Sequence, residues 1–325
     1  MKRSITGMLL GLLISIVAFV IVGLRVEETP RVVNVWPLII GVGAAVLTWL
    51  LQGLVMYLLA RSQLKSIRLR DMVRIYLAAA FIGGISPVRG LEIPYEVYLL
   101  NRVGLPAGTG GAVVIIRGML NSSVVVLGAL LGLIFASGLP QVEQKTFILL
   151  GIAALMAGAW ALLTYIARRT RGRTRRGQER SAQSWRYRWR AKILNFIKEL
   201  RDAFVLILRQ EPRLLVASGV IMVLYWAVRL SIGPLSLMAA GWSGDWVAVI
   251  VAQMVLITFV LSLAPTPGAS GAAELGFAAL VAPHVPGGVL LSGVLIWRGL
   301  THFFQTVVGA FFAGRQLGEG IVHDG

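Results

Sequence analysis

The sequence contains no cysteine and only three histidines. The absence of cysteine excludes disulfide bonds, thiol nucleophiles and thiolate metal sites. The histidines, His284, His302 and His323, are scattered, and no paired-histidine metalloprotease motif is present. There is also no Gly-x-Ser-x-Gly element of the kind that presents a nucleophilic serine. The sequence therefore predicts a protein that is not an enzyme, with no metal and no cofactor.

Charged residues are also scarce. They make up 14% of the 325 residues, whereas 57% are hydrophobic; a soluble domain carries about 25% charged residues. The net charge is +17, but about half of the 31 lysines and arginines fall between residues 168 and 213. The basic character thus belongs to one loop and excludes a nucleic-acid-binding surface. These features predict an all-α, polytopic membrane protein.

Six apolar runs are long enough to cross a bilayer, which takes about 20 residues of helix. The first run is not followed by a small-x-small cleavage site, which favours a membrane span over a cleaved signal peptide. The six predicted full transmembrane helices are residues 5–24, 35–60, 112–137, 147–167, 214–240 and 288–314.

Two further apolar regions are shorter and are interrupted by proline and glycine, which break helices. We interpret them as re-entrant helical hairpins, at about residues 73–101 and 246–282, that meet near the middle of the membrane. Irregular backbone at that depth is tolerated where protein or a water-filled cavity surrounds it. The predicted break residues are Ser86, Pro87, Gly90, Pro265, Pro267, Gly268 and Gly271.

Loop charges predict the orientation of the chain. Basic residues are concentrated at positions 61–74 and 168–213, which the positive-inside rule assigns to the cytoplasm. Both termini are then cytoplasmic, and the two hairpins enter from opposite sides. The chain is predicted to be an inverted repeat, with a first half at 1–167, a basic loop and amphipathic helix at 168–213, and a second half at 214–325.

The second part of the basic loop has helical periodicity. Apolar residues recur every three or four positions and basic residues lie between them, which is typical of an amphipathic helix. We expect this helix to lie on the anionic inner leaflet; the alternative is that it gathers anionic lipid for transport. Its apolar residues are Trp185, Trp189, Ile193, Phe196, Leu200, Phe204 and Ile207.

A charged motif follows each predicted break. Glu92 precedes Arg117 by 25 residues, and Glu274 precedes Arg298 by 24. Charged residues at membrane depth are costly and indicate function. A purely structural pairing of Glu with Arg is one interpretation; the other is that arginine forks and helix N-termini bind phosphate oxygens. The candidate substrate-binding residues are Arg89, Glu92, Arg117, Glu274, Arg298 and His302, with Glu96 close to them in the sequence.

Two stretches carry a family resemblance. Residues 265–274, followed by 297–300, resemble the lysylphosphatidylglycerol synthase transmembrane region family of flippase-like proteins, and residues 87–92 and 98–105 agree with it. The resemblance covers essentially the whole chain. It implies a bacterial or archaeal cytoplasmic membrane protein that moves lipid headgroups or lipid-linked sugars between leaflets. No soluble aminoacyl transferase domain is present, so lipid aminoacylation is not implied.

The first half departs from the family pattern at three positions. Tyr95 stands where many relatives carry arginine, with Glu96 beside it. Ile116 precedes Arg117 where a glutamate is frequent, and Asn121 lies near an aspartate position. The first-half site is therefore predicted to be less polar than in relatives, which affects the headgroup more than the fold.

The function predicted from the sequence is that of a lipid translocase, with anionic phospholipid or lipid-linked phosphate as its partner. Two alternatives from other classes stay open. One is a secondary transporter for a small anion or organic ion. The other is a membrane scaffold that does not transport and whose basic loop docks a partner enzyme.

Overall fold

The computed structural model describes residues 32–86, 90–135, 158, 195–196, 198–207, 212–261 and 266–323, with 129–135, 259–261 and 316–323 described by their backbone alone. Within these ranges helices are the only regular secondary structure, and no strand is present. The spans predicted at 5–24 and 147–167 lie outside the described residues. So do the residues Pro87, Arg89 and Pro265, and the first part of the predicted amphipathic helix, with Trp185, Trp189 and Ile193.

Four helices are long and apolar enough to cross a membrane. They are α2 (Val35–Arg61), α5 (Ala107–Phe135), α8 (Pro212–Ala239), and α11 (Gly287–Arg298) continued through η5 (Gly299–Phe303) into α12 (Phe304–His323). These helices coincide with four of the six spans predicted from the sequence. The chain is thus a multi-helix membrane protein, as its composition indicates.

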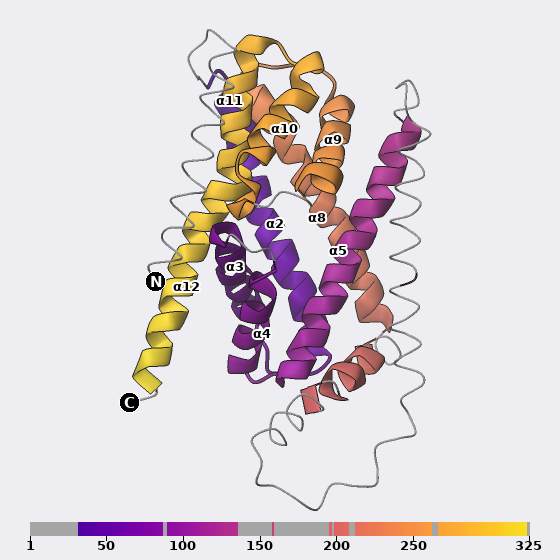
Figure 1. Cartoon of the computed structure of the whole chain (residues 1–325), viewed down its shortest axis with the longest axis vertical. Coiled ribbons are helices and arrows are strands. Elements are labelled where there is room, and N and C mark those ends of the chain that lie inside the picture. The colour runs from indigo at the N-terminus through magenta and orange to yellow at the C-terminus, as the bar shows by residue number, and fades with distance from the viewer. Residues whose placement is uncertain are drawn as a thin grey trace, which may run out of the picture.

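Two hairpins of shorter helices lie at opposite ends of the long helices (Figure 1). The first consists of α3 (Leu69–Ile85) and α4 (Glu92–Arg102). The second consists of α9 (Trp246–Val255) with η2 (Leu256–Leu261), and of η3 (Pro267–Ala269) with α10 (Ala272–Val281). In each hairpin the two arms pack against each other. Their ranges agree with the predicted 73–101 and 246–282 to within four residues.

Each hairpin is packed into its own apolar core. One core joins α3, α4 and α5 to α2 and α8 and includes Met56, Leu100 and Met222. The other joins α9, α10 and α11 to the same two long helices and includes Ile232 and Phe277. Helices α2 and α8, which pack against each other, therefore run through both cores and hold the two hairpins in register.

Residues 198–207 form a helix that packs against the start of α5. The backbone N–H of Gly108 donates to the Glu199 carboxylate at 3.0 Å. Phe204 and Ile207 are buried. These two members of the predicted apolar stripe face the protein core rather than a lipid surface, so packing within the protein accounts for part of the periodicity assigned to the inner leaflet.

Candidate functional site

The break of the second hairpin is built from backbone conformations that favour glycine. Gly268 has φ 57° and Gly271 has φ 83°, and Ala269 between them has φ 56°. A non-glycine residue with positive φ is uncommon and strained. Thr266 Oγ1 donates to the Ser270 carbonyl oxygen at 2.8 Å and closes the turn. The sequence around Pro267 thus folds as a tight reversal that exposes backbone polar groups inside the helix bundle.

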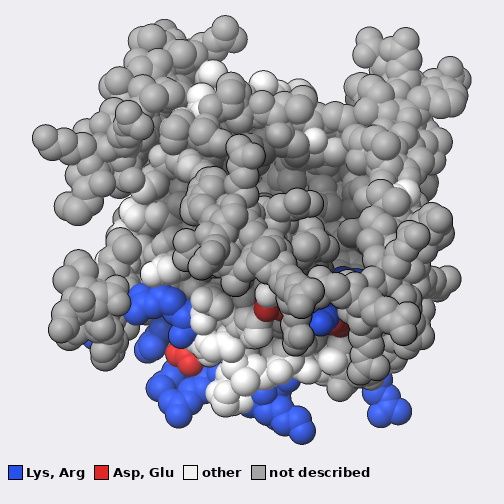
Figure 2. Space-filling view, turned by 60° about the horizontal axis from the view of Figure 1, so that its bottom comes forward, with Lys and Arg blue, Asp and Glu red and all other residues white. Residues whose placement is uncertain are grey.

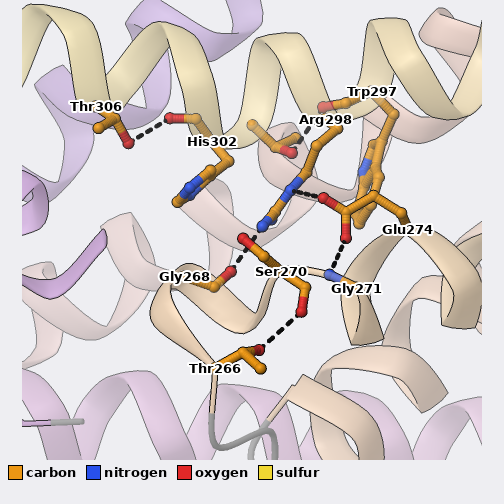
Figure 3. A network of polar contacts seen from close by, with 10 residues as sticks. Thr266, Gly268, Ser270, Gly271, Glu274, Trp297, Arg298, His302 and Thr306 are labelled. Atoms are coloured by element: carbon orange, nitrogen blue, oxygen red, sulfur yellow. Dashed lines mark hydrogen bonds and ion pairs between the residues drawn. The ribbon is translucent and has the colours of Figure 1, made fainter. Parts of the chain in front are cut away.

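Glu274 and Arg298 join this break to α11 (Figure 3). Arg298 Nε donates to Glu274 Oε1 at 2.8 Å, and Arg298 Nη2 donates to the Gly268 carbonyl oxygen at 2.7 Å. The other Glu274 oxygen accepts from the Gly271 N–H at 2.7 Å. The Glu274 side chain is fully buried and that of Arg298 is 5% exposed. The predicted pair is therefore present, and it also fixes both sides of the break.

The breaks of the two hairpins meet at His302. A Cβ atom on Gly268 would lie 2.3 Å from His302 Cε1 and 3.2 Å from the carbonyl oxygen of Gly84, which belongs to α3. A Cβ atom on Gly84 would lie 3.4 Å from His302 Cε1 and 3.2 Å from Thr306 Oγ1. Figure 3 shows the His302 ring directed toward Gly268. The absence of side chains at these glycines allows three helical segments to converge at one point.

The first half repeats the contact between carboxylate and break but pairs its arginine differently. Glu92 Oε2 accepts from the Gly90 N–H at 3.0 Å, as Glu274 does from Gly271. Arg117, however, donates from Nη2 to Glu96 at 2.5 Å. Glu92 thus corresponds to Glu274 in its hydrogen bond to the backbone at the break. It does not correspond to Glu274 in the ion pair, which Glu96 makes instead. Glu96 lies one helical turn further along α4, on the side that faces α5.

Arg117 sits in a polar cluster drawn from five helices. It donates from Nη1 to Gln52 Oε1 at 3.3 Å and lies over the Tyr76 ring, 5.6 Å from its centre. Gln305 Nε2 donates to the Tyr76 hydroxyl at 3.2 Å. Glu96 Oε1 and Arg117 Nε are buried without a hydrogen-bond partner within the described part of the chain. This site is less completely satisfied than that of Glu274.

Sequence reasoning missed Arg229, which lies within α8. Its Nη1 donates to the Thr301 carbonyl oxygen in η5 at 3.2 Å. The signal was available, because a charged residue inside a predicted span is a candidate functional residue. It was overlooked because Arg229 belongs to no repeated motif.

Gln253 was also missed. This buried residue donates to the Leu230 carbonyl oxygen at 2.7 Å and accepts from Trp297 Nε1 at 3.2 Å. It joins α9 to α8 and α11 next to the Glu274 site. An amide inside an apolar helix is the signal that identifies such a residue.

No group of three or more metal-ligating side chains was found in a search confined to the described ranges. Of the predicted site residues, Glu274, Arg298 and His302 form one cluster. Glu92 lies at the adjoining break, since a Cβ atom on Gly83 would lie 3.2 Å from Glu92 Oε2. Ser86 ends α3 and is buried at the same break.

The arrangement can be compared with known proteins. The family described as lysylphosphatidylglycerol synthase TM region matches residues 8–309. The chain belongs to this family. It is also similar to a UPF0104 membrane protein from Archaeoglobus fulgidus, with 25% identity over 279 residues, covering 83% of each chain.

The lysylphosphatidylglycerol synthase TM region match includes both hairpins, α2, α5 and α8, and the fourth long helix as far as residue 309. The departures noted in the first half acquire a structural meaning. Asn121 accepts from Trp226 Nε1 at 3.1 Å and so joins α5 to α8. The Tyr95 hydroxyl is buried and has no hydrogen-bond partner within the described ranges. In the described interior of this half, neutral polar contacts therefore accompany the Glu96–Arg117 ion pair.

Proposed function

We propose that the protein is a lipid translocase that moves a phosphate-bearing or sugar-linked lipid headgroup between the leaflets of the cytoplasmic membrane. The observation that carries the proposal is the meeting of the two hairpin breaks at His302, next to the buried Glu274–Arg298 pair. Paired interrupted segments in corresponding positions of two halves are the feature that identifies a transporter site near the bilayer midplane. The family's description, which refers to a lipid-modifying synthase, supports a lipid as the substrate class.

The proposed membrane arrangement has six full spans and two re-entrant hairpins. The four long helices support four of the spans, and the short hairpins at opposite ends support re-entry from both sides. Figure 2 shows lysines and arginines around the end of the molecule that is at the bottom of Figure 1. Exposed Arg70 and Arg74 at the start of α3 lie at this end. The positive-inside rule assigns such an end to the cytoplasm, together with both termini.

The proposed site works by exchange of hydrogen-bond partners. Arg298 donates to one carboxylate and to one backbone carbonyl at a break. An anionic headgroup that enters competes for the same planar guanidinium, which suits phosphate oxygens. Glu274 then keeps its hydrogen bond to Gly271 and its place at the start of α10. The partner is an anionic phospholipid or a lipid-linked phosphate, and no covalent chemistry is required of the protein.

Reconstitution into liposomes tests this proposal. Labelled lipid is placed in one leaflet and its movement is followed with wild type, Arg298→Ala and Arg298→Lys. Arg298→Ala leaves Glu274 buried without its cation, a change that costs about 3–5 kcal/mol in comparable pairs. Arg298→Lys keeps the charge and loses the planar fork, so the folded variant is expected to move lipid at least about ten-fold more slowly, as for the loss of one charge-assisted hydrogen bond.

Arg315→Ala is the matched control, since Arg315 is exposed on α12 away from the breaks. Equal lipid movement by wild type and folded Arg298→Lys would contradict the mechanism. Coupled uptake of a soluble anion or organic ion instead would indicate a secondary transporter. Loss of cellular function on deletion of residues 168–180, with Glu274→Gln silent, would indicate a scaffold.

A further inference from the structure

The interior arginines differ in how their charge is balanced. Arg298 is paired with Glu274, and Arg117 is paired with Glu96. Arg229 has no carboxylate within 4.0 Å in the part of the chain that the structure describes, and its one hydrogen bond there goes to the Thr301 carbonyl oxygen. Within the described ranges it is therefore a cation without a paired carboxylate, inside a helix proposed to cross the membrane. A charged residue inside a membrane costs free energy, so its presence indicates a function.

Arg229 lies beside the second-half cluster. Its Nη1 donates to the carbonyl oxygen of Thr301, which is next to His302 and three residues after Arg298 in the chain. The charge of Arg229 also acts on Tyr76, over whose ring Arg117 lies in the first-half cluster. A ligand at Arg229 is therefore close to His302 and electrostatically coupled to the first-half cluster.

A comparison of the two halves shows that this positive charge is not a requirement of the fold. Gln52 on α2 lies 17 residues before the start of α3, and Arg229 on α8 lies 17 residues before the start of α9. Gln52 is neutral and its amide oxygen accepts from Arg117. The equivalent place in the second half carries a guanidinium instead. A neutral amide is sufficient at this position of the first half, so the cation at the corresponding position of the second half requires another explanation.

Arg229 retains the capacity to bind a ligand. A guanidinium has five N–H donors in a planar fork, and one nitrogen of Arg229 contacts Thr301. The residue is partly exposed rather than sealed in the core. Its protein acceptor lies in η5, a π-helical turn, and such turns occur frequently at functional sites. The remaining donors match the oxygens of a phosphate group.

We propose that Arg229 is the primary phosphate-binding residue of the translocation site and that the substrate is a phosphate-bearing lipid rather than a neutral glycolipid. This assignment rests on the proposed lipid translocase. It places the first phosphate contact at Arg229, because Arg117 and Arg298 are already balanced by carboxylates. The two ion pairs hold the hairpins until the headgroup arrives, and Arg298 then exchanges its partners for the headgroup that Arg229 has bound.

Binding is measured separately from transport. Full-length protein in detergent is titrated with phosphatidylglycerol and with a diacylglycerol glycolipid of matched chain length that lacks phosphate. Wild type is expected to prefer the phosphate lipid, and Arg229→Gln is expected to bind it about ten-fold more weakly or worse, as for loss of a charge-assisted hydrogen bond. Glycolipid binding is expected to stay the same. Arg229→Lys keeps the charge and should retain part of the preference.

Arg213→Gln is the matched control, because Arg213 is exposed in the first turn of the same helix. The proposal is overturned if folded Arg229→Gln binds phosphatidylglycerol as tightly as wild type. It is also overturned if Arg229→Gln and Arg229→Lys each lose affinity for phosphatidylglycerol and for the glycolipid to the same extent. In either case lipid movement by the wild type still supports the translocase.

Competition with soluble glycerol 3-phosphate identifies the source of the phosphate. Failure of the soluble compound to displace phosphatidylglycerol supports the lipid. Effective displacement that depends on Arg229 would point to a soluble phosphate solute: Arg229 would still contact phosphate, but the lipid substrate proposed here would be overturned together with the translocase.

Discussion

At the scale of single residues, the two halves divide the same tasks differently. Glu274 both binds the Gly271 N–H at the break and neutralises Arg298. In the first half Glu92 contacts the break, whereas Glu96 neutralises Arg117. A carboxylate that accepts from a backbone N–H can be replaced by an amide more easily than one that balances a buried cation. The two first-half glutamates should therefore differ in their effect on stability.

We expect Glu96→Gln to destabilise the protein much more than Glu92→Gln. Glu96 is 1% exposed, and its loss leaves Arg117 without a counter-charge, a change worth about 3–5 kcal/mol in comparable buried pairs. The Glu92 position keeps an acceptor for Gly90 in the amide oxygen of glutamine. Thermal unfolding in detergent measures the difference. An equal or larger loss for Glu92→Gln would mean that Glu92 is the true partner of Arg117.

Gly268→Ala is expected to disturb the meeting of the hairpins. The added Cβ would lie 2.3 Å from His302 Cε1, and the φ of 57° is unfavourable for alanine. Adding His302→Ala should relieve the steric part and recover some stability in a double-mutant cycle. Gly287→Ala is the control, because a Cβ there meets nothing within 4 Å. Additive effects of the two site substitutions would argue against the contact.

At the scale of elements, Phe196, Glu199 and Leu200 pack against α5 at Gly108. A Cβ on Gly108 would lie 2.4 Å from the Phe196 carbonyl oxygen, so Gly108→Ala must separate this segment from α5. Gly118→Ala on the same helix meets nothing within 4 Å. Hydrogen exchange of residues 198–207 is expected to accelerate in the first variant only. Unchanged protection in both would show that the segment does not depend on this contact.

The hairpins themselves could be predicted closely from the sequence, because proline and glycine leave few alternatives to a break at Gly83–Ser86 and near Pro267. The pairing of Arg117 could not. Glu92 and Glu96 lie on one short helix, and only the packing of α4 against α5 decides which of them reaches the arginine. Arg229 could have been identified as a charged residue inside a predicted span. Its contact with η5 could not be predicted, because it depends on how α8 packs against that segment. The π-helical form of η2 and η5 could not be predicted either, because such short segments leave no distinct periodicity in the sequence.

At the scale of the whole molecule, the described part of each half contains a long helix, a broken hairpin and a second long helix. Helices α2 and α5 flank α3 and α4, and α8 and α11 flank α9 and α10. The hairpins lie at opposite ends (Figure 1). If the halves are inverted in the membrane, the starts of α3 and α9 face different compartments.

Single-cysteine labelling tests this orientation, and the native chain contains no cysteine to interfere. Arg70→Cys at the start of α3 and Ser243→Cys just before α9 both replace exposed residues. In sealed right-side-out vesicles an impermeant maleimide should label Ser243→Cys, whereas Arg70→Cys should react only after permeabilisation. Labelling of both from the same side would exclude the inverted arrangement.

The contact between the hairpin tips has a consequence for the permeability of a bilayer that contains the protein. Gly84, Gly268 and His302 are in close contact where the two interrupted segments meet. We expect this contact to interrupt any continuous column of water between the tips and so to limit the passage of protons and small ions. Separation of the tips should raise the electrical leak of reconstituted membranes, and that leak would report how often the tips separate.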